Sequence, residues 1–253
     1  MLRYEQMTYD EIEAQIKNRM LIIPAGSVEQ HSKHLPLAVD SIISTKLSER
    51  LANEMDAIVA PTLSYGAISL SNSGGGMDYV QTIGIRGDIL IGWYEQVIKG
   101  YVRAGAKKIL ILNAHWENEP FLIQAIELIK EQLPKDVVIA ELSWWSLIGN
   151  NDMIRIFGQF SSWSEEHAAQ AETALMMALE PSLVRKFCKD VKCLNQNMDI
   201  YTTRRNEAVF ANHGSLGPYS HVTKSMAVQF EKLVESRMLE MVGEIQFNDR
   251  LYS

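Results

Sequence analysis

The stretch that decides the fold reads Leu21-Ile22-Ile23-Pro24 and, after a short link, Glu29-Gln30-His31-Ser32-Lys33-His34-Leu35-Pro36-Leu37-Ala38-Val39-Asp40. The apolar residues predict a buried strand, and the polar run after it gathers Glu, His and Asp side chains in one turn. Such donors, with no Cys nearby, are typical of a catalytic Zn²⁺ or Mn²⁺ site and not of a structural zinc site. The end of a strand is also where an α/β protein places its chemistry.

A second predicted strand ends in the same kinds of side chain. It reads Lys107-Lys108-Ile109-Leu110-Ile111-Leu112 and is followed by Asn113-Ala114-His115-Trp116-Glu117-Asn118. If the two strands are neighbours in a parallel sheet, their carboxyl ends converge on one crevice. Each residue alone would more often be a solvated or capping group, but the repetition favours metal binding. Five candidate ligands are enough for two ions when one carboxylate bridges them: Glu29, His31, Asp40, His115 and Glu117.

The fold class follows from an alternation of helix and strand signals, which is typical of βα units on a mainly parallel sheet. The expected strands are 21–24, 57–60, 107–112 and 137–142. The expected helices are one capped by Thr8 and Glu11, and then 42–55, 88–104, 119–132, 168–179 and 225–245. We therefore predict a three-layer α/β/α protein, and 253 residues fit a single domain over 1–253.

Composition excludes several classes of protein. The content of 47% hydrophobic and 22% charged residues is ordinary for a globular protein, and no apolar run approaches the roughly 18 residues of a membrane span. The formal net charge of −7 argues against nucleic-acid binding. The first residues lack a signal peptide pattern, so we expect a cytoplasmic protein. Cys188 and Cys193 suggest neither a disulfide framework nor a four-Cys zinc site.

Aromatic residues lie near the predicted site. Ser143-Trp144-Trp145-Ser146 follows a strand, where alternation would point the two rings to opposite faces and let only one reach the site. In Trp163-Ser164-Glu165-Glu166-His167, the Trp suggests a lid residue and His167 a proton donor, with a capping His as the alternative. The glycines of Ser73-Gly74-Gly75-Gly76 allow positive φ, in a connector or beside a ligand.

These motifs resemble the creatininase (creatinine amidohydrolase) family along nearly the whole chain. The family has a Glu-Gln-His-Gly-x-His-Leu-Pro…Asp loop, matched by Glu29 to Pro36 and Asp40, and an Asn-Gly-His-Gly-Gly-Asn loop, matched by Asn113 to Asn118. The aromatic-Glu-Asn ending of the second loop is typical of creatininase members. Further matches are Ser73 to Gly76, Ser143-Trp144-Trp145, and Trp163 with Glu166-His167 and Glu172-Thr173.

The resemblance implies a set of roles. Two divalent ions, Zn and/or Mn, would be held by Glu29, Asp40 and His115 and by His31, Asp40 and Glu117, with Asp40 bridging. His167 and Glu117 would be catalytic, with His167 shuttling the proton. The substrate would be bound by Ser73, Gly74, Trp116, Glu117, Trp145 and Trp163. Family members are commonly homohexamers.

The implied reaction is the reversible hydrolysis of creatinine, a small cyclic amide, to creatine by a metal-bridging hydroxide. Ser32, Lys33 and the segment 78–82 depart from the family pattern and leave the substrate open. One alternative is a related amidohydrolase, either a formamide deformylase or a small-peptide peptidase, and Lys33 binding an anionic group would favour it. A non-catalytic metal-binding scaffold is the other alternative.

Overall fold

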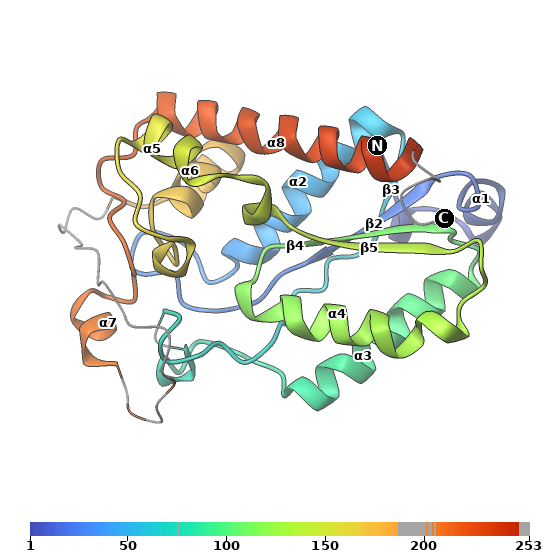
Figure 1. Ribbon diagram of the computed structural model, residues 1–253, viewed down its shortest axis with the longest axis horizontal. Helices are drawn as coiled ribbons and strands as arrows, with labels where there is room; N and C mark the ends of the chain where they lie inside the picture. Colours follow the sequence, from blue (N-terminus) through green and yellow to red (C-terminus); the bar gives the residue numbers. More distant parts are fainter. Residues whose placement is uncertain (75, 187–200, 202–203, 205, 248–253) are drawn as a thin grey trace.

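Five parallel strands form the central sheet, in the order β1-β3-β2-β4-β5 (Figure 1). The computed structural model describes residues 1–74, 76–186, 201, 204 and 206–247. The strands are β1 (Leu2–Arg3), β2 (Met20–Ala25), β3 (Ile58–Val59), β4 (Lys108–Asn113) and β5 (Val138–Ser143). The predicted parallel sheet is confirmed, with one short strand, β1, added at its edge.

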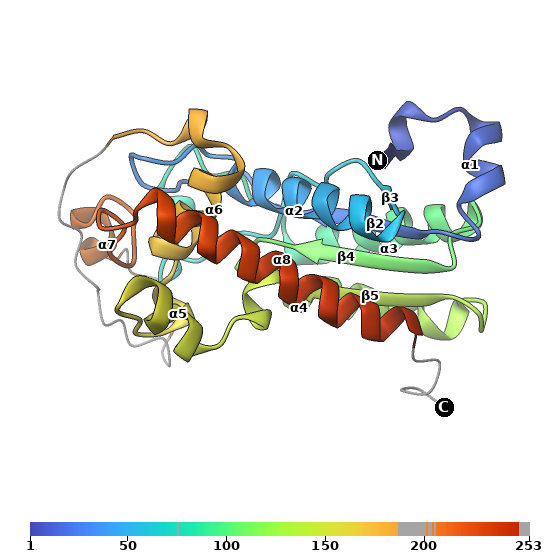
Figure 2. The same ribbon diagram turned by 90° about the horizontal axis from the view of Figure 1, so that it is seen from above.

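Helices cover both faces of the sheet (Figure 1). They are α1 (Tyr9–Gln15), α2 (Val39–Met55), α3 (Gly87–Arg103), α4 (Glu119–Ile129), α5 (Asn150–Phe157), α6 (Gln170–Leu179), α7 (Glu207–Ala211) and α8 (Lys224–Phe247). One apolar core joins α2, α5, α6 and α8 to the sheet, and a second joins α1, α3 and α4. Seen from above, α8 lies across the sheet beside α2 (Figure 2). This is the predicted three-layer α/β/α class.

Strand alternation explains why the sheet is apolar on both faces. Leu21 and Ile23 of β2 pack into the core with α3 and α4, while Ile22 packs into the core with α2 and α8. All three side chains are fully buried, as a strand covered on both faces requires. In the register, Ala25 pairs with Asn113, and Asn113 with Ser143. The loops that follow these strands therefore all start at the same level, at the carboxyl ends of β2, β4 and β5.

Several element boundaries differ from the prediction. The Thr8 capping box is confirmed, with the hydroxyl accepting from the amide of Glu11. Helix α2 begins at Val39, so Asp40 lies in its first turn and not in the loop before it. The short β1, α5 and α7 were not predicted. Cys188 and Cys193 lie outside the described residues, and none of the described helices has the length and apolar character to span a bilayer.

Candidate active site

Four polar side chains from three elements meet beyond the carboxyl ends of β2 and β4. Glu29 and His31 lie in the loop after β2, Asp40 in the first turn of α2, and His115 just after β4. All four are buried, with relative exposures of 4%, 0%, 1% and 1%. Burial of charged groups is costly unless they are paired or bind a metal, so this cluster demands a partner of opposite charge.

The first group of three ligand atoms centres on His115. Its Nδ1 lies 3.0 Å from Oδ2 of Asp40 and 3.3 Å from Oε1 of Glu29. The ligand atoms of these residues all lie within 4.8 Å of one another. The predicted first metal set is therefore brought together as a compact group.

A second group shares Asp40. Nε2 of His31 lies 3.1 Å from Oδ1 of Asp40 and 3.6 Å from Oε1 of Glu172. Because the two oxygens of Asp40 face different histidines, its carboxylate lies between the two groups. Glu172 comes from the first turn of α6, where its other oxygen accepts a hydrogen bond from the amide of Ala168 at 2.6 Å.

Each histidine here has one ring nitrogen against a backbone carbonyl. The pairs are Nδ1 of His31 with Glu29 O at 3.2 Å, Nε2 of His115 with Ala67 O at 3.2 Å, and Nε2 of His167 with Gln30 O at 2.9 Å. A carbonyl oxygen only accepts, so that ring nitrogen carries the hydrogen. The lone pair of the other nitrogen then faces carboxylate oxygens, which also only accept, so a cation between them would satisfy both.

The residues present fit bound cations. Nε2 of His31 and Oδ2 of Asp40 are buried without a hydrogen-bond partner of acceptable geometry among the described residues. Burial alone would lower the pKa of His31, but Glu172 and Asp40 outweigh it and raise that pKa well above its usual value. The pKa of His115 is raised in the same way, by Glu29 and Glu117 against burial. The site therefore attracts positive charge, which divalent ions at the lone pairs would supply.

Glu117 lies on the opposite edge of the His115 ring from Asp40. Its Oε2 is 3.5 Å from Nε2 of His115, and its Oε1 accepts from the amide of Leu70 at 3.1 Å. Burial raises the pKa of Glu117. The resemblance grouped Glu117 with His31 and Asp40, but the carboxylate that completes this group in the structure is Glu172.

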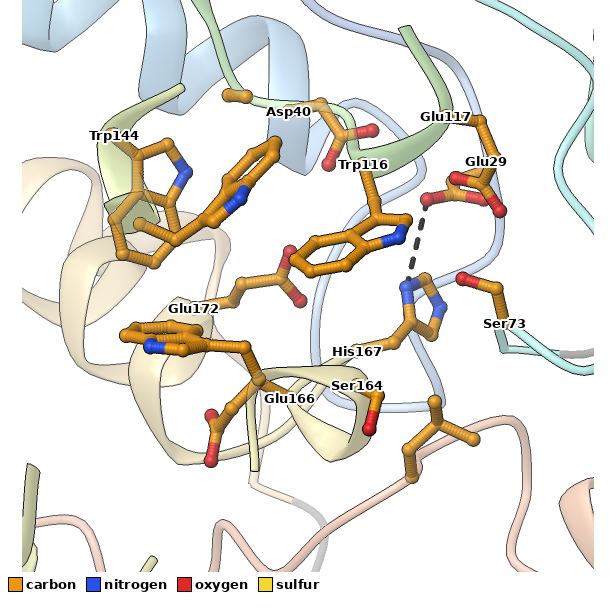
Figure 3. Close-up of a pocket in the computed structure, with 14 residues that line it drawn as sticks. Glu29, Asp40, Ser73, Trp116, Glu117, Trp144, Ser164, Glu166, His167 and Glu172 are labelled. Atoms are coloured by element: carbon orange, nitrogen blue, oxygen red, sulfur yellow. Dashed lines mark ion pairs between the residues drawn. The ribbon is translucent and has the colours of Figure 1, made fainter. Parts of the chain in front are cut away.

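His167 borders the same cluster from the loop before α6. Its Nδ1 lies 3.5 Å from Oε1 of Glu29, shown as the dashed line in Figure 3. Gly74 packs against the other side of the ring: a Cβ added there would lie 2.3 Å from Cδ2 of His167. Ser73 lines the cavity, whereas Gly74 supports the imidazole and is absent from the described lining. The structure therefore places Gly74 directly against the His167 ring, so that its role in substrate binding stays a prediction.

Tryptophans form one wall of the cavity (Figure 3). Trp116 and Trp145 stack with centroids 5.3 Å apart, and Trp144 meets Trp145 and Trp163 edge-on. The expectation that only one of Trp144 and Trp145 would reach the site is wrong. Strand β5 ends at Ser143, and the 3₁₀ turn Trp144–Leu147 brings both rings to the cavity.

Three residues of the site were missed or underused in the sequence. Glu166 and Glu172 appeared only as members of a matched motif, with no role given to them, and Trp144 as one of two rings of which only one was expected to reach the site. Glu166 lines the cavity, and burial raises its pKa to about 8. All three belong to motifs that the resemblance matched, Ser143-Trp144-Trp145 and Trp163 with Glu166-His167 and Glu172-Thr173, and that match was the available signal.

Comparison with known proteins agrees with this arrangement. The family model for creatininase (creatinine amidohydrolase) matches residues 5–242. The creatinine amidohydrolase of Pseudomonas putida is 33% identical over 187 residues, covering 71% of this chain and 72% of that protein. The 3-dehydro-scyllo-inosose hydrolase of Thermotoga maritima is 25% identical over 185 residues, covering 72% of this chain and 58% of that protein.

Solved creatininase structures share the fold over nearly the whole length. A mutant creatininase in complex with creatine has a TM-score of 0.89 at 25% identity, covering 98% of this chain and 99% of that one. A manganese form has a TM-score of 0.86 at 25% identity, covering 98% of this chain and 99% of that one. A zinc–zinc form superimposes with a TM-score of 0.86 at 24% identity, covering 97% of this chain and 98% of that one.

Fold and site together define an α/β/α hydrolase with a buried carboxylate–histidine centre able to hold metal ions. The chain belongs to the creatininase family, whose model covers almost all of it. It is accordingly a hydrolase that acts on amide bonds.

Proposed function

We propose that the protein hydrolyses creatinine reversibly to creatine, with two divalent ions, Zn²⁺ and/or Mn²⁺, in the buried centre. One observation carries the proposal: a single cavity joins the two Asp40-linked groups to His167 and to a wall of tryptophans. A small planar cyclic amide fits such a wall by stacking on the rings. The named activity of the Pseudomonas putida relative supports the choice of substrate.

The ligands divide between the two groups. Glu29, Asp40 and His115 would hold one ion, and His31, Asp40 and Glu172 the other. When bound, such ions lower the pKa of water towards neutrality and polarise a carbonyl oxygen, which is the chemistry that amide hydrolysis needs. Carboxylate and imidazole donors suit both Zn²⁺ and Mn²⁺.

His167 is the group to move the proton. Its Nε2 hydrogen is committed to the carbonyl of Gln30, so Nδ1 is the atom that exchanges a proton with the substrate. Hydrolysis breaks the ring carbon–nitrogen amide bond, adds the oxygen of water to the carbonyl carbon and requires a proton on the departing nitrogen. Nδ1 of His167 would take a proton from the attacking water and pass it to that nitrogen.

Glu117 and the tryptophans would orient the ring. Glu117, Trp116, Trp145 and Trp163 all line the cavity, with Ser73 at its edge. A carboxylate held by the amide of Leu70 presents acceptor oxygens to the amino and guanidino-type nitrogens of creatinine. The aromatic rings supply planar faces on which such a substrate would stack.

The position of Lys33 favours creatinine over the related amidohydrolase activities. It lies in a separate groove with Ser32, Tyr79 and Phe210, and not along the described lining of the tryptophan cavity. The cavity itself carries carboxylates and no lysine or arginine among its described residues. An anionic substrate would find no cationic side chain there, whereas a neutral or cationic ring is accepted.

The test is an assay of the purified chain, reconstituted with Zn²⁺ or Mn²⁺, for interconversion of creatinine and creatine. Glu117→Gln is expected to abolish turnover, while Glu127→Gln, an exposed carboxylate on α4, leaves it unchanged. A protein that binds two metal ions but does not turn over creatinine would contradict creatinine as the substrate, and other amides would then be tested. Metal binding without hydrolysis of any amide would support the scaffold alternative.

We also expect a homohexamer and a cytoplasmic location, as the family resemblance and the N-terminal sequence imply. These remain predictions. Light scattering coupled to size-exclusion chromatography measures the mass of the assembly, and a monomeric mass of 28.6 kDa would contradict the hexamer.

A further inference from the structure

Glu141 is a partly buried carboxyl group that lies outside the described lining of the cavity. It is on β5, among the apolar residues of a strand whose inner neighbour is β4. An acidic side chain is costly in this position, because desolvation penalises its charge. The cost of desolvating the Glu141 carboxyl must therefore be offset by hydrogen bonds.

Hydrogen bonds connect Glu141 to the metal-binding turn. The hydroxyl of Ser143 donates to Oε1 of Glu141 at 2.8 Å. The amide Nδ2 of Asn113 donates to the same hydroxyl at 3.0 Å, and Oδ1 of Asn113 accepts from the backbone amide of His115 at 3.1 Å. Asn113 of β4 and Ser143 of β5 are opposite each other in the strand register, and both side chains are almost completely buried.

The directions of these hydrogen bonds fix which group is the donor and which is the acceptor at each step. Because Glu141 accepts the hydroxyl hydrogen, the oxygen of Ser143 is left as an acceptor, and Asn113 must present its NH₂ group to it. The carbonyl end of the Asn113 side chain then faces the amide of His115. If the Asn113 amide were reversed, its NH₂ group would face that amide, donor against donor.

We propose that Glu141 is a positioning residue that, through Ser143 and Asn113, holds the His115 turn in its metal-binding conformation. His115 needs this support because its ring must reach Asp40 and Glu29 with Nδ1 while Nε2 donates to Ala67. The inference rests on the proposed function only in requiring that the centre binds metal. Outer partners of this kind typically change metal affinity by about 10- to 100-fold.

The electrostatic surroundings agree with an acceptor role that does not depend on charge. Burial raises the pKa of Glu141 to about 7, and the carboxylate of Glu119 at the start of α4 adds to the shift. A protonated carboxyl still has a carbonyl oxygen for the hydroxyl of Ser143. A glutamine at position 141 offers the same acceptor oxygen without charge, so Glu141→Gln should keep the hydrogen bond from Ser143.

The experiment measures binding of Mn²⁺ to the full chain from the loss of the free-ion electron paramagnetic resonance signal. Glu141→Leu and Ser143→Ala are expected to weaken binding by about tenfold or more, and Glu141→Gln to retain it. Ile139→Val is the matched control, since it loosens packing on the same strand and face without touching the hydrogen bonds. Thermal unfolding of all four variants verifies that they fold.

The outcomes are separable. Weak binding in Glu141→Leu and Ser143→Ala, with near-native binding in the other two variants, supports the inference. Native affinity in Glu141→Leu, equal loss in Glu141→Gln, or equal loss in Ile139→Val would overturn it. A native chain that binds no Mn²⁺ or Zn²⁺ would overturn the proposed metal centre, and this inference with it.

Discussion

Oδ2 of Asp40 lies 3.0 Å from Nδ1 of His115, while its Oδ1 faces Nε2 of His31 at 3.1 Å. One carboxylate thus belongs to both ligand groups. The first turn of α2 supplies this residue, and the fully buried Val39 beside it packs into the core and fixes where that turn begins. We expect a side chain shared by both groups to matter more for metal binding than a residue that belongs to only one of them.

Asp40→Asn is therefore expected to remove both metal ions and reduce turnover by at least about a hundredfold, because each group loses an anionic oxygen. Metal content by inductively coupled plasma mass spectrometry is the measurement. Asp10→Asn is the control, an exposed aspartate in the first turn of α1. Retention of one full equivalent of metal in Asp40→Asn would argue against the shared position.

Glu172 and Glu117 should separate metal binding from substrate binding. Glu172→Gln is expected to lower the metal content from two towards one, since only the His31 group contains Glu172. Glu117→Gln should keep the metal content and lose turnover, because Glu117 lies outside those groups but lines the cavity. If Glu117→Gln loses metal and Glu172→Gln keeps it, Glu117 and not Glu172 is the third ligand beside His31 and Asp40.

The strand ends were predictable, and the ligand from α6 was not. Strands β2 and β4 are continuous apolar runs, as buried parallel strands require, and their polar ends identified Glu29, His31 and His115. Glu172 reaches the site only because α6 packs against α8 and α2 on one face of the sheet. No local pattern encodes such a long-range contact. The Trp144 ring was misplaced because strand alternation stops where the 3₁₀ turn begins.

The support of His167 by Gly74 predicts a position-specific effect. Gly74 has φ +91, which strains any side chain, and an added methyl would push the imidazole out of place. Gly74→Ala is expected to lower kcat by about tenfold or more while metal content stays at the native value. Gly92→Ala is the control, because a Cβ at this helical glycine meets nothing within 4 Å. Unchanged kcat in Gly74→Ala would remove the positioning role.

The last prediction concerns the pH dependence of stability. Burial raises the pKa of Glu166 from its usual 4.5 to about 8, against hydrogen bonds from the amide of Ala171 and the side chain of Gln170. A carboxyl whose pKa is higher in the folded chain stabilises that chain while protonated. This contribution is complete below about pH 4.5 and is lost as the pH rises through 8.

The melting temperature of the metal-free chain should therefore fall between pH 5 and 8, and His31 and His115 act in the same direction because their pKa values are also raised. Glu166→Gln removes one titrating group and should flatten the decline, whereas Glu13→Gln, an exposed carboxylate on α1, should leave it unchanged. Differential scanning calorimetry across this range measures both. Parallel curves for Glu166→Gln and the native chain would show that Glu166 is ionised at neutral pH in the folded protein.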